Sequence, residues 1–438
     1  MSIIYYGAEK TPAYMVSKLR EWMTKTGEPK AFVFREETLR KFKTPIYLNR
    51  YPVMSIEDAV KAYPDCEVYV VYQSENIAKS EAMRLLAKVP GNKIHFLEAD
   101  LEFRKNCSQM GKSLFYRNGN IPICTVGNRH VPGFKVNADA SNIDKILDEW
   151  SALTTKLARE NQVDAKNKCF GCPQMKYGFY KKTPKVENLF FMQNLRYDSC
   201  NLRCQYCFSI TTDRWSELKT IDGPSTYEVI KNLSEHPDFK DRGNDFTVTF
   251  ANGEICVNKY FEDIMNVLLN VKWNIEIISN MSVYREGLAE LMKTGRVKKV
   301  ITSLDCGTRE TFKKLKINDR FNQTVENLHK YDFSKTTLIV KYVFLEGYND
   351  NEADIDAFYD IVKSVGGIVM ISADNKTNKN PYTDKENLKN LTDRLIHHAV
   401  KGSSHVIADI NNLNVADVTY INKTAKQLKT THLQTQTS

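Results

Sequence analysis

Long hydrophobic runs are missing from this chain of 438 residues. No apolar stretch approaches the roughly 20 residues that a membrane-spanning helix needs. Residues 1–8 lack the basic and then apolar pattern of a secretion signal. We therefore expect a cytoplasmic protein with no membrane span. A composition of 42% hydrophobic and 26% charged residues is that of a globular chain, and its length suggests two or three domains.

Clusters of basic residues are also missing, and so is a secretion signal that would take the cysteines to a compartment where disulfides form. The chain has 62 Lys and Arg against 53 Asp and Glu, a net charge of +9, but no arginine-rich run and no basic patch interleaved with aromatics. Nucleic acid is therefore an unlikely partner, and the basic balance suits an anionic small molecule or a solvated surface. Ten cysteines without a secretion signal predict reduced thiols. A tight cysteine cluster would then indicate metal binding or catalysis.

The first 105 residues alternate strand-like and helix-like segments. Four short apolar runs are separated by segments with helical spacing, which predicts a small Rossmann-like α/β domain over residues 1–105. The turn that begins at Gly7 lacks the second and third glycines of a dinucleotide fingerprint. We therefore favour an accessory docking or scaffold domain over a nucleotide-binding domain. The four runs cover residues 3–6, 31–34, 68–72 and 94–97.

The rest of the chain divides into four further segments. Residues 106–186 are less regular and predict a connector that carries its own cysteines. Residues 187–375 repeat a strand followed by a helix six times, which predicts a partial parallel (β/α)6 barrel with functional residues at the C-terminal ends of its strands. We expect residues 376–420 to form a helical and strand extension, and residues 421–438 to form a disordered tail. The expected barrel strands are residues 189–195, 246–250, 274–279, 299–304, 337–344 and 368–372.

Three cysteines follow the first expected barrel strand at spacings of four and three residues. A loop of this length can bring the thiolates of Cys200, Cys204 and Cys207 to one side, around a single soft-metal centre. Structural zinc and electron-transfer clusters normally take four protein ligands, whereas three ligands on a four-iron cube leave one iron open for chemistry. The alternative is a zinc knuckle completed by a distant histidine, which leaves the strand-end residues described next unexplained.

The Cys-x3-Cys-x2-Cys spacing, with Tyr206 before the third cysteine, resembles the radical S-adenosylmethionine superfamily. Asn252-Gly253-Glu254 follows the second strand and is similar to that family's Gly-Gly-Glu, which receives the methionine ammonium group. The first glycine is replaced by Asn252. Further polar residues after the third and fourth strands are similar to family positions that contact the ribose and the methionine carboxylate. These residues are Asn280, Ser303 and Asp305.

The resemblance implies a mechanism and its partners. A [4Fe-4S] cluster on the three cysteines would reductively cleave S-adenosylmethionine to a 5′-deoxyadenosyl radical, with an electron donor such as flavodoxin or ferredoxin. The chain resembles members from surface-polysaccharide gene clusters, which implies a sugar, nucleotide-sugar or other cell-surface precursor as a small-molecule or carrier-linked substrate. No cysteine follows Cys306, which disfavours a peptide-modifying enzyme. A peptide substrate and a non-catalytic iron–sulfur sensor or scaffold stay open as alternatives.

Four upstream cysteines form a second set, consisting of Cys107, Cys124, Cys169 and Cys172. Four is the number that closes a structural zinc site or a fully ligated [4Fe-4S] cluster. Their order resembles the amino-terminal pattern of the polysaccharide-cluster enzymes and implies an auxiliary cluster. Zinc binding, or burial of Cys107 and Cys124 as small apolar side chains, are the alternatives.

Overall fold

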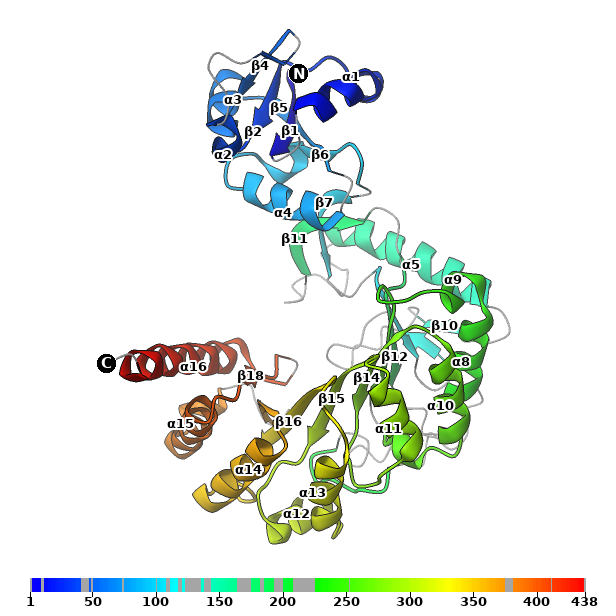
Figure 1. The fold of residues 1–438 in the computed structure, drawn as a ribbon, viewed down its shortest axis with the longest axis vertical. Helices are drawn as coiled ribbons and strands as arrows, with labels where there is room; N and C mark the ends of the chain where they lie inside the picture. Colours follow the sequence, from blue (N-terminus) through cyan, green and yellow to red (C-terminus); the bar gives the residue numbers. More distant parts are fainter. Residues whose placement is uncertain are drawn as a thin grey trace. The chain divides into compact units, whose positions relative to one another are not determined.

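The computed structural model of the chain contains two compact units (Figure 1). The first unit joins residues 1–112 with 150–185, and the second joins residues 113–149 with 186–438. Each unit is described by itself. The residues described are 2–8, 12–40, 47–48, 50–72, 75–99, 101–107, 111–116, 120–122, 135–137, 143–163, 175–181, 185–192, 200–207, 225–251, 253–374, 381–410 and 412–436.

The first unit contains a six-stranded sheet in the order β3-β4-β2-β1-β5-β6, parallel except for the β3–β4 pair. Alternate residues of β1 enter two separate cores, because successive strand side chains point to opposite faces. Ile3 and Tyr5 pack with Trp22 of α1, whereas Ile4 and Tyr6 pack with α3 and α4 residues. Helices therefore cover both faces, which confirms the predicted Rossmann-like architecture. The strands are β1 (Ser2–Ala8), β2 (Ala31–Phe34), β3 (Tyr47–Leu48), β4 (Tyr51–Met54), β5 (Cys66–Val70) and β6 (Ile94–Phe96), and the helices are α1 (Pro12–Thr26), α2 (Glu36–Leu39), α3 (Ile56–Ala62), α4 (Glu75–Leu85) and η1 (Gly91–Lys93).

The predicted connector, residues 106–186, is divided between the two units. In the first unit, β7 (Leu101–Cys107) pairs antiparallel with β11 (Met175–Lys181). In the second unit, the fully buried strand β8 (Ser113–Tyr116) pairs with the large sheet, which explains why the unit boundary falls inside the connector. The remaining described elements of this segment are β9 (Asn120–Pro122), β10 (Lys135–Asn137) and α5 (Ile143–Val163).

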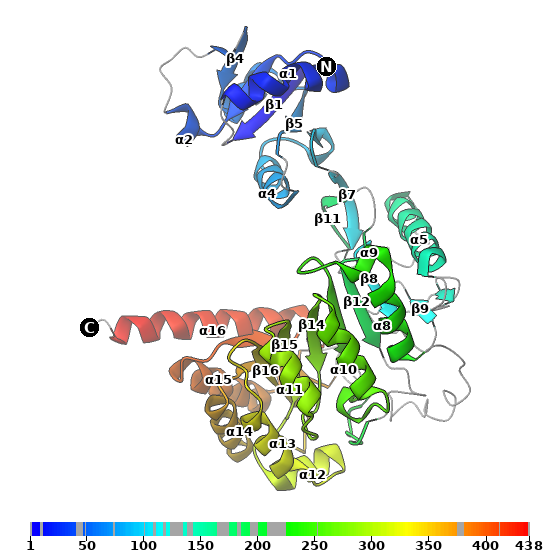
Figure 2. The same cartoon turned by 45° about the vertical axis from the view of Figure 1, so that its right-hand side comes forward.

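The second unit is built on an eight-stranded parallel sheet in the order β18-β17-β16-β15-β14-β13-β12-β8 (Figure 2). Its six consecutive strands β12 to β17 match the six predicted strands, so the predicted parallel α/β fold is confirmed. β8 and β18 form the two edges of the described sheet. The strands are β12 (Asn188–Met192), β13 (Thr247–Ala251), β14 (Asn274–Ile278), β15 (Val297–Ser303), β16 (Thr337–Phe344), β17 (Ile368–Ala373) and β18 (Val406–Ala408).

The helices between these strands bury one face of the sheet. Val300, Tyr342 and Ile371 are buried on that face, whereas Ser303 and Lys341, paired in register on β15 and β16, are only partly buried. The half-exposed face therefore carries polar side chains near the C-terminal ends of its strands. The helices are α8 (Thr226–Glu235), α9 (Pro237–Lys240), η4 (Ile255–Val257), α10 (Phe261–Asn270), α11 (Glu286–Lys293), α12 (Arg309–Lys316), α13 (Phe321–Lys330), α14 (Glu352–Ser364), η5 (Tyr382–Asp384), α15 (Glu386–Lys401) and α16 (Val415–Gln436).

The prediction of a disordered tail over residues 421–438 is wrong for residues 421–436, because α16 extends to Gln436. Residues 437–438 lie outside the described residues. Asn414 accepts a hydrogen bond from the Asp417 N–H at 2.9 Å and so caps the start of this helix. Ile421 and Ala425, four residues apart, are buried on the face that contacts α15. These two buried apolar residues and the capping hydrogen bond thus stabilise a helix whose sequence is otherwise polar. Among the described helices, none is long and apolar enough to cross a membrane.

Candidate functional site

The loop that carries Cys200, Cys204 and Cys207 lies against the C-terminal end of α12. The backbone N–H of Arg203 donates to the Lys316 carbonyl at 3.0 Å, and that of Gln205 donates to the Leu315 carbonyl at 2.9 Å. These carbonyls end a helix and have no intrahelical partner, so the loop supplies the donors that the helix end needs. The side-chain amide of Asn318 donates to the Asn201 carbonyl at 2.8 Å and adds a third link.

Two donors reach the sulfur of Cys200. The backbone N–H of Leu202 lies 3.5 Å from it, and the side-chain amide of Asn280 lies 3.7 Å from it. The Asn280 amide is fixed by a 2.9 Å bond to the Asn201 side chain. Burial raises the pKa of the Cys200 thiol to about 11, an effect that the Leu202 N–H opposes. N–H donors aimed at a cysteine sulfur are a feature by which proteins tune iron–sulfur clusters.

The three cysteines fit a cluster as a donor set. None of the three forms a disulfide, and all three are partly buried. The backbone N–H of Cys207 donates to the Cys204 carbonyl at 2.9 Å, so a tight turn joins the last two. Within the described ranges, no three His, Cys, Asp or Glu side chains are grouped for one metal ion. A four-iron cube places each thiolate on a different iron, so its ligands do not converge on one point.

Glu254 joins the ends of β13 and β14. One carboxylate oxygen accepts from the Cys256 N–H at 3.0 Å and from the Ser279 hydroxyl at 2.8 Å, and the other accepts from the Asn280 N–H at 2.6 Å. Burial raises the pKa of this carboxyl, although these donors counteract it. Glu254, Asn280 and Cys200 therefore form one continuous series of contacts from the predicted cofactor-binding segment to the predicted cluster loop.

Three other residues are predicted to bind the cofactor, namely Gly253, Asn252 and Ser303. Gly253 has a positive φ of 70°, a conformation that glycine adopts without strain, and Asn252 lies outside the described residues. Ser303 ends β15 and is partly buried. Its carbonyl accepts from the Lys316 ammonium at 2.8 Å.

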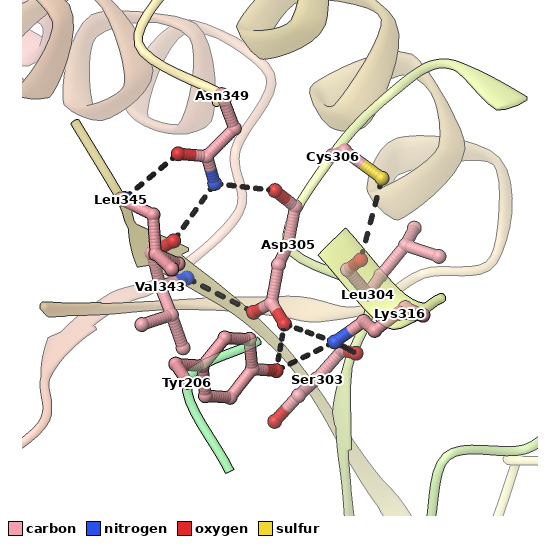
Figure 3. A network of polar contacts seen from close by, with 9 residues as sticks. All are labelled: Tyr206, Ser303, Leu304, Asp305, Cys306, Lys316, Val343, Leu345 and Asn349. Atoms are coloured by element: carbon pink, nitrogen blue, oxygen red, sulfur yellow. Dashed lines mark hydrogen bonds and ion pairs between the residues drawn. The ribbon is translucent and has the colours of Figure 1, made fainter. Parts of the chain in front are cut away.

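Asp305 faces the protein interior, at the centre of a polar network (Figure 3). Its side chain forms an ion pair with Lys316 and accepts a hydrogen bond from the Tyr206 hydroxyl. Its other carboxylate oxygen accepts from the Val343 N–H at 2.9 Å. The sequence predicts a contact of Asp305 with the cofactor, which stays a prediction; in the structure the partners of this carboxylate are Lys316, Tyr206 and the Val343 N–H.

Two residues that were not predicted from the sequence, Lys316 and Asn349, complete this network. Lys316 falls four residues after Phe312, on the buried face of α12, which was the available signal for an unusual lysine. The Asn349 side-chain amide donates to the Asp305 carbonyl and to the Val343 carbonyl, both at 2.7 Å. Its position in a turn after β16 carries no distinctive sequence signal.

The second cysteine set is only partly placed. Cys107 ends β7 in the first unit, and its backbone N–H donates to the Asn106 side chain at 2.8 Å. Cys124, Cys169 and Cys172 lie outside the described residues. An auxiliary cluster or zinc site on these four cysteines stays a prediction.

Several solved structures are similar to this chain. Streptococcus suis SuiB is 12% identical with a TM-score of 0.38, and the match covers 63% of this chain and 56% of that chain. A radical SAM methyltransferase from Sphaerobacter thermophilus is 12% identical with a TM-score of 0.32, and the match covers 48% of this chain and 63% of that chain. A domain of pyruvate-formate lyase-activating enzyme from Bacteroides vulgatus is 15% identical with a TM-score of 0.30, and the match covers 38% of this chain and 99% of that domain. No protein of curated function matches the chain. The chain thus spans little more than half of the length of SuiB. Residues 195–359 match the Radical SAM superfamily, and this part of the chain belongs to that superfamily of enzymes.

Proposed function

We propose that Cys200, Cys204 and Cys207 hold three irons of a [4Fe-4S] cluster and leave the fourth iron free for S-adenosylmethionine. When both are bound, they supply reductive cleavage of a carbon–sulfur bond, which gives a 5′-deoxyadenosyl radical. The observation that carries the proposal is the cysteine loop itself. It lies in the matched superfamily segment, its three cysteines form no disulfide, and the Cys200 sulfur receives two N–H donors.

We propose that the methionine moiety binds at the ends of β13 and β14. The positive φ of Gly253 leaves room for close approach to the backbone, and the Glu254 carboxylate places negative charge where an ammonium group would bind. Asn280 extends from Glu254 to Cys200, so it lies between the two ligands. Ser303 offers a hydroxyl on the half-exposed sheet face, and Asn252 is proposed from sequence alone.

For the substrate, we propose a sugar, nucleotide-sugar or other cell-surface precursor, either free or on a carrier. The support is the order of Cys107, Cys124, Cys169 and Cys172, which resembles enzymes of surface-polysaccharide gene clusters. We propose a cytoplasmic location, which suits the absence of a disulfide among the described cysteines and a cluster that needs reduction.

We propose that an acidic electron donor of the flavodoxin or ferredoxin type docks beside the cluster loop. The loop residue Arg203 and the α12 residues Lys313 and Lys314 are exposed, and no ion pair engages them in the described part of the chain. Ile317, which follows α12, is 52% exposed and supplies an apolar contact next to these charges. The Lys313→Glu/Lys314→Glu variant should lower flavodoxin-driven turnover several-fold at low salt, while turnover with dithionite stays unchanged. Equal loss with both reductants would contradict this docking site.

The proposed activity has a direct test. Anaerobically reconstituted protein, given dithionite and S-adenosylmethionine, should release 5′-deoxyadenosine, and candidate nucleotide-sugars should stimulate that release. Cys204→Ala should abolish the product, whereas Cys66→Ala, which removes a buried thiol of the first unit, should retain it.

Two other outcomes would favour a different function. A fully assembled cluster that yields no 5′-deoxyadenosine with several reductants would favour a sensor or scaffold, and stimulation by a peptide alone would favour a peptide-modifying enzyme.

The auxiliary site has a separate test. A variant with alanine at Cys200, Cys204 and Cys207 should keep iron or zinc if the four upstream cysteines bind metal, and complete loss of both metals would rule that site out.

A further inference from the structure

The buried ion pair of Lys316 and Asp305 needs an explanation beyond stability. The two side chains are 1% and 0% exposed. Removing two charges from water is costly, and apolar residues of similar volume often stabilise such a position as well or better. A buried pair is therefore weak support for a purely stabilising role. Its location at the cluster loop suggests a function.

The network holds the tip of Tyr206 between two side chains, those of Lys316 and Asp305. The Lys316 ammonium donates to the Tyr206 hydroxyl at 2.6 Å and lies 4.9 Å from the centre of its ring. The hydroxyl in turn donates to the Asp305 carboxylate. Tyr206 lies between Cys204 and Cys207, whose turn is closed by a backbone hydrogen bond. Holding this side chain therefore holds both thiols.

The Asp305 carboxylate is itself fixed by the sheet. Asp305 has a φ of +64°, a left-handed conformation that is unfavourable for a residue other than glycine. Backbone contacts hold it there: its N–H donates to the Lys341 carbonyl at 3.1 Å, and its carbonyl accepts from Asn349 at 2.7 Å. Strained residues held in this way are common at functional sites.

The charges of the pair also act on the cluster loop. The Lys316 ammonium lies 2.6 Å from the hydroxyl of Tyr206, the residue between Cys204 and Cys207, and the Asp305 carboxylate accepts a hydrogen bond from the same hydroxyl. A buried cation at this place would favour the reduced, more negative form of a bound cluster, and a buried anion would favour the oxidised form.

We propose that Asp305 and Lys316 are positioning residues that hold Tyr206, Cys204 and Cys207 in place, and that their opposite charges set the reduction potential of the cluster. This inference rests on the proposed function. It assigns the pair to tuning the cluster loop, with no contact to S-adenosylmethionine.

The midpoint potential of the cluster tests the role of the charges, because removing each charge should shift it in the opposite direction. In reconstituted full-length protein, Lys316→Met should shift the cluster midpoint potential to more negative values, and Asp305→Asn should shift it to more positive values, as followed by EPR during redox titration. Lys314→Met removes an exposed charge from the same helix and should leave the potential unchanged. Shifts of the same sign in both variants, or no shift in either, would overturn the assignment of charge.

The positioning role is tested without any metal. Tyr206→Phe keeps the ring and removes only the hydroxyl, so amide hydrogen exchange of residues 200–207 in the apo protein should become several-fold faster. Tyr284→Phe, which removes a hydroxyl bonded to exposed Glu286, should leave that exchange unchanged. Unaltered exchange in Tyr206→Phe would overturn the positioning role. If wild-type protein assembles no cluster, the proposed function fails; if it does and these variants behave as wild type, only this inference fails.

Discussion

Two buried carboxylates at strand ends, Glu254 after β13 and Asp305 after β15, look alike in sequence and differ in electrostatics. Glu254 is held by two N–H groups and a hydroxyl, and no ion pair joins it to a cation in the described ranges. Asp305 is paired with the Lys316 ammonium. The contrast teaches that Glu254 keeps a negative charge that a cationic ligand could stabilise, whereas the charge of Asp305 is already balanced within the protein.

The largest effect should come from breaking the balanced pair. Asp305→Ala leaves the Lys316 ammonium buried without its partner, and we expect it to lower the free energy of unfolding by about 3–5 kcal/mol. Urea denaturation of the apo protein measures this loss. Adding Lys316→Met in the same chain removes the unpaired charge and should recover part of the stability. A double variant that is no more stable than Asp305→Ala would contradict the balanced-pair explanation.

Glu254, whose carboxylate has no cationic partner in the described ranges, should contribute more than Asp305 to the binding of S-adenosylmethionine. Glu254→Gln keeps the shape of the side chain and removes its charge, so we expect KM for S-adenosylmethionine to rise about tenfold, equivalent to about 1.4 kcal/mol. Asp305→Asn should change this KM by less than about threefold, since Lys316 already balances the charge of this carboxylate. The kinetics of 5′-deoxyadenosine release measure both, and similar KM increases would remove the distinction.

The burial of Glu254 should also appear in how the free energy of unfolding changes with pH. Burial raises the pKa of Glu254 above its ordinary 4.5, so the folded state binds this proton more tightly than the unfolded chain does. The stabilisation is complete below pH 4.5 and is lost as the pH rises through the raised pKa. Without S-adenosylmethionine, Glu254→Gln should therefore lose less unfolding free energy than wild type over this rise. The exposed Glu290→Gln serves as control, and parallel curves for wild type and Glu254→Gln would refute the raised pKa.

The smallest effect should come from removing one donor to Glu254. Ser279→Ala deletes the 2.8 Å hydroxyl bond, and we expect a loss of about 1 kcal/mol in unfolding free energy. KM for S-adenosylmethionine should stay near the wild-type value, because the carboxylate keeps its charge and two backbone donors. A KM increase as large as that of Glu254→Gln would mean that Ser279 itself contacts the ligand.

The sequence was sufficient for the features that depend on local pattern. Buried parallel strands are read from their apolar runs, and β16 occupies residues 337–344 as predicted. The cysteine spacing and the strand-end positions of Glu254 and Asn280 followed from the same pattern, and the structure brings these residues together.

The features that depend on distant contacts could not be predicted in this way. Lys316 follows Lys313 and Lys314 in a basic helix and looks like a solvated lysine until the fold buries it beside Asp305. Tyr206 was noted as the aromatic residue of the motif, but its hydroxyl partner is 99 residues away. The order of α16 likewise depends on packing against α15, which local composition does not encode.

The contact between the cysteine loop and α12 also constrains how the chain could change. Arg203 and Gln205, on either side of Cys204, donate the two N–H groups that complete the end of the helix. An inserted residue between Cys200 and Cys204 would leave the Leu315 and Lys316 carbonyls without these donors as well as displacing a thiol. The cysteine spacing is therefore dictated by the geometry of a helix end as much as by the demands of iron.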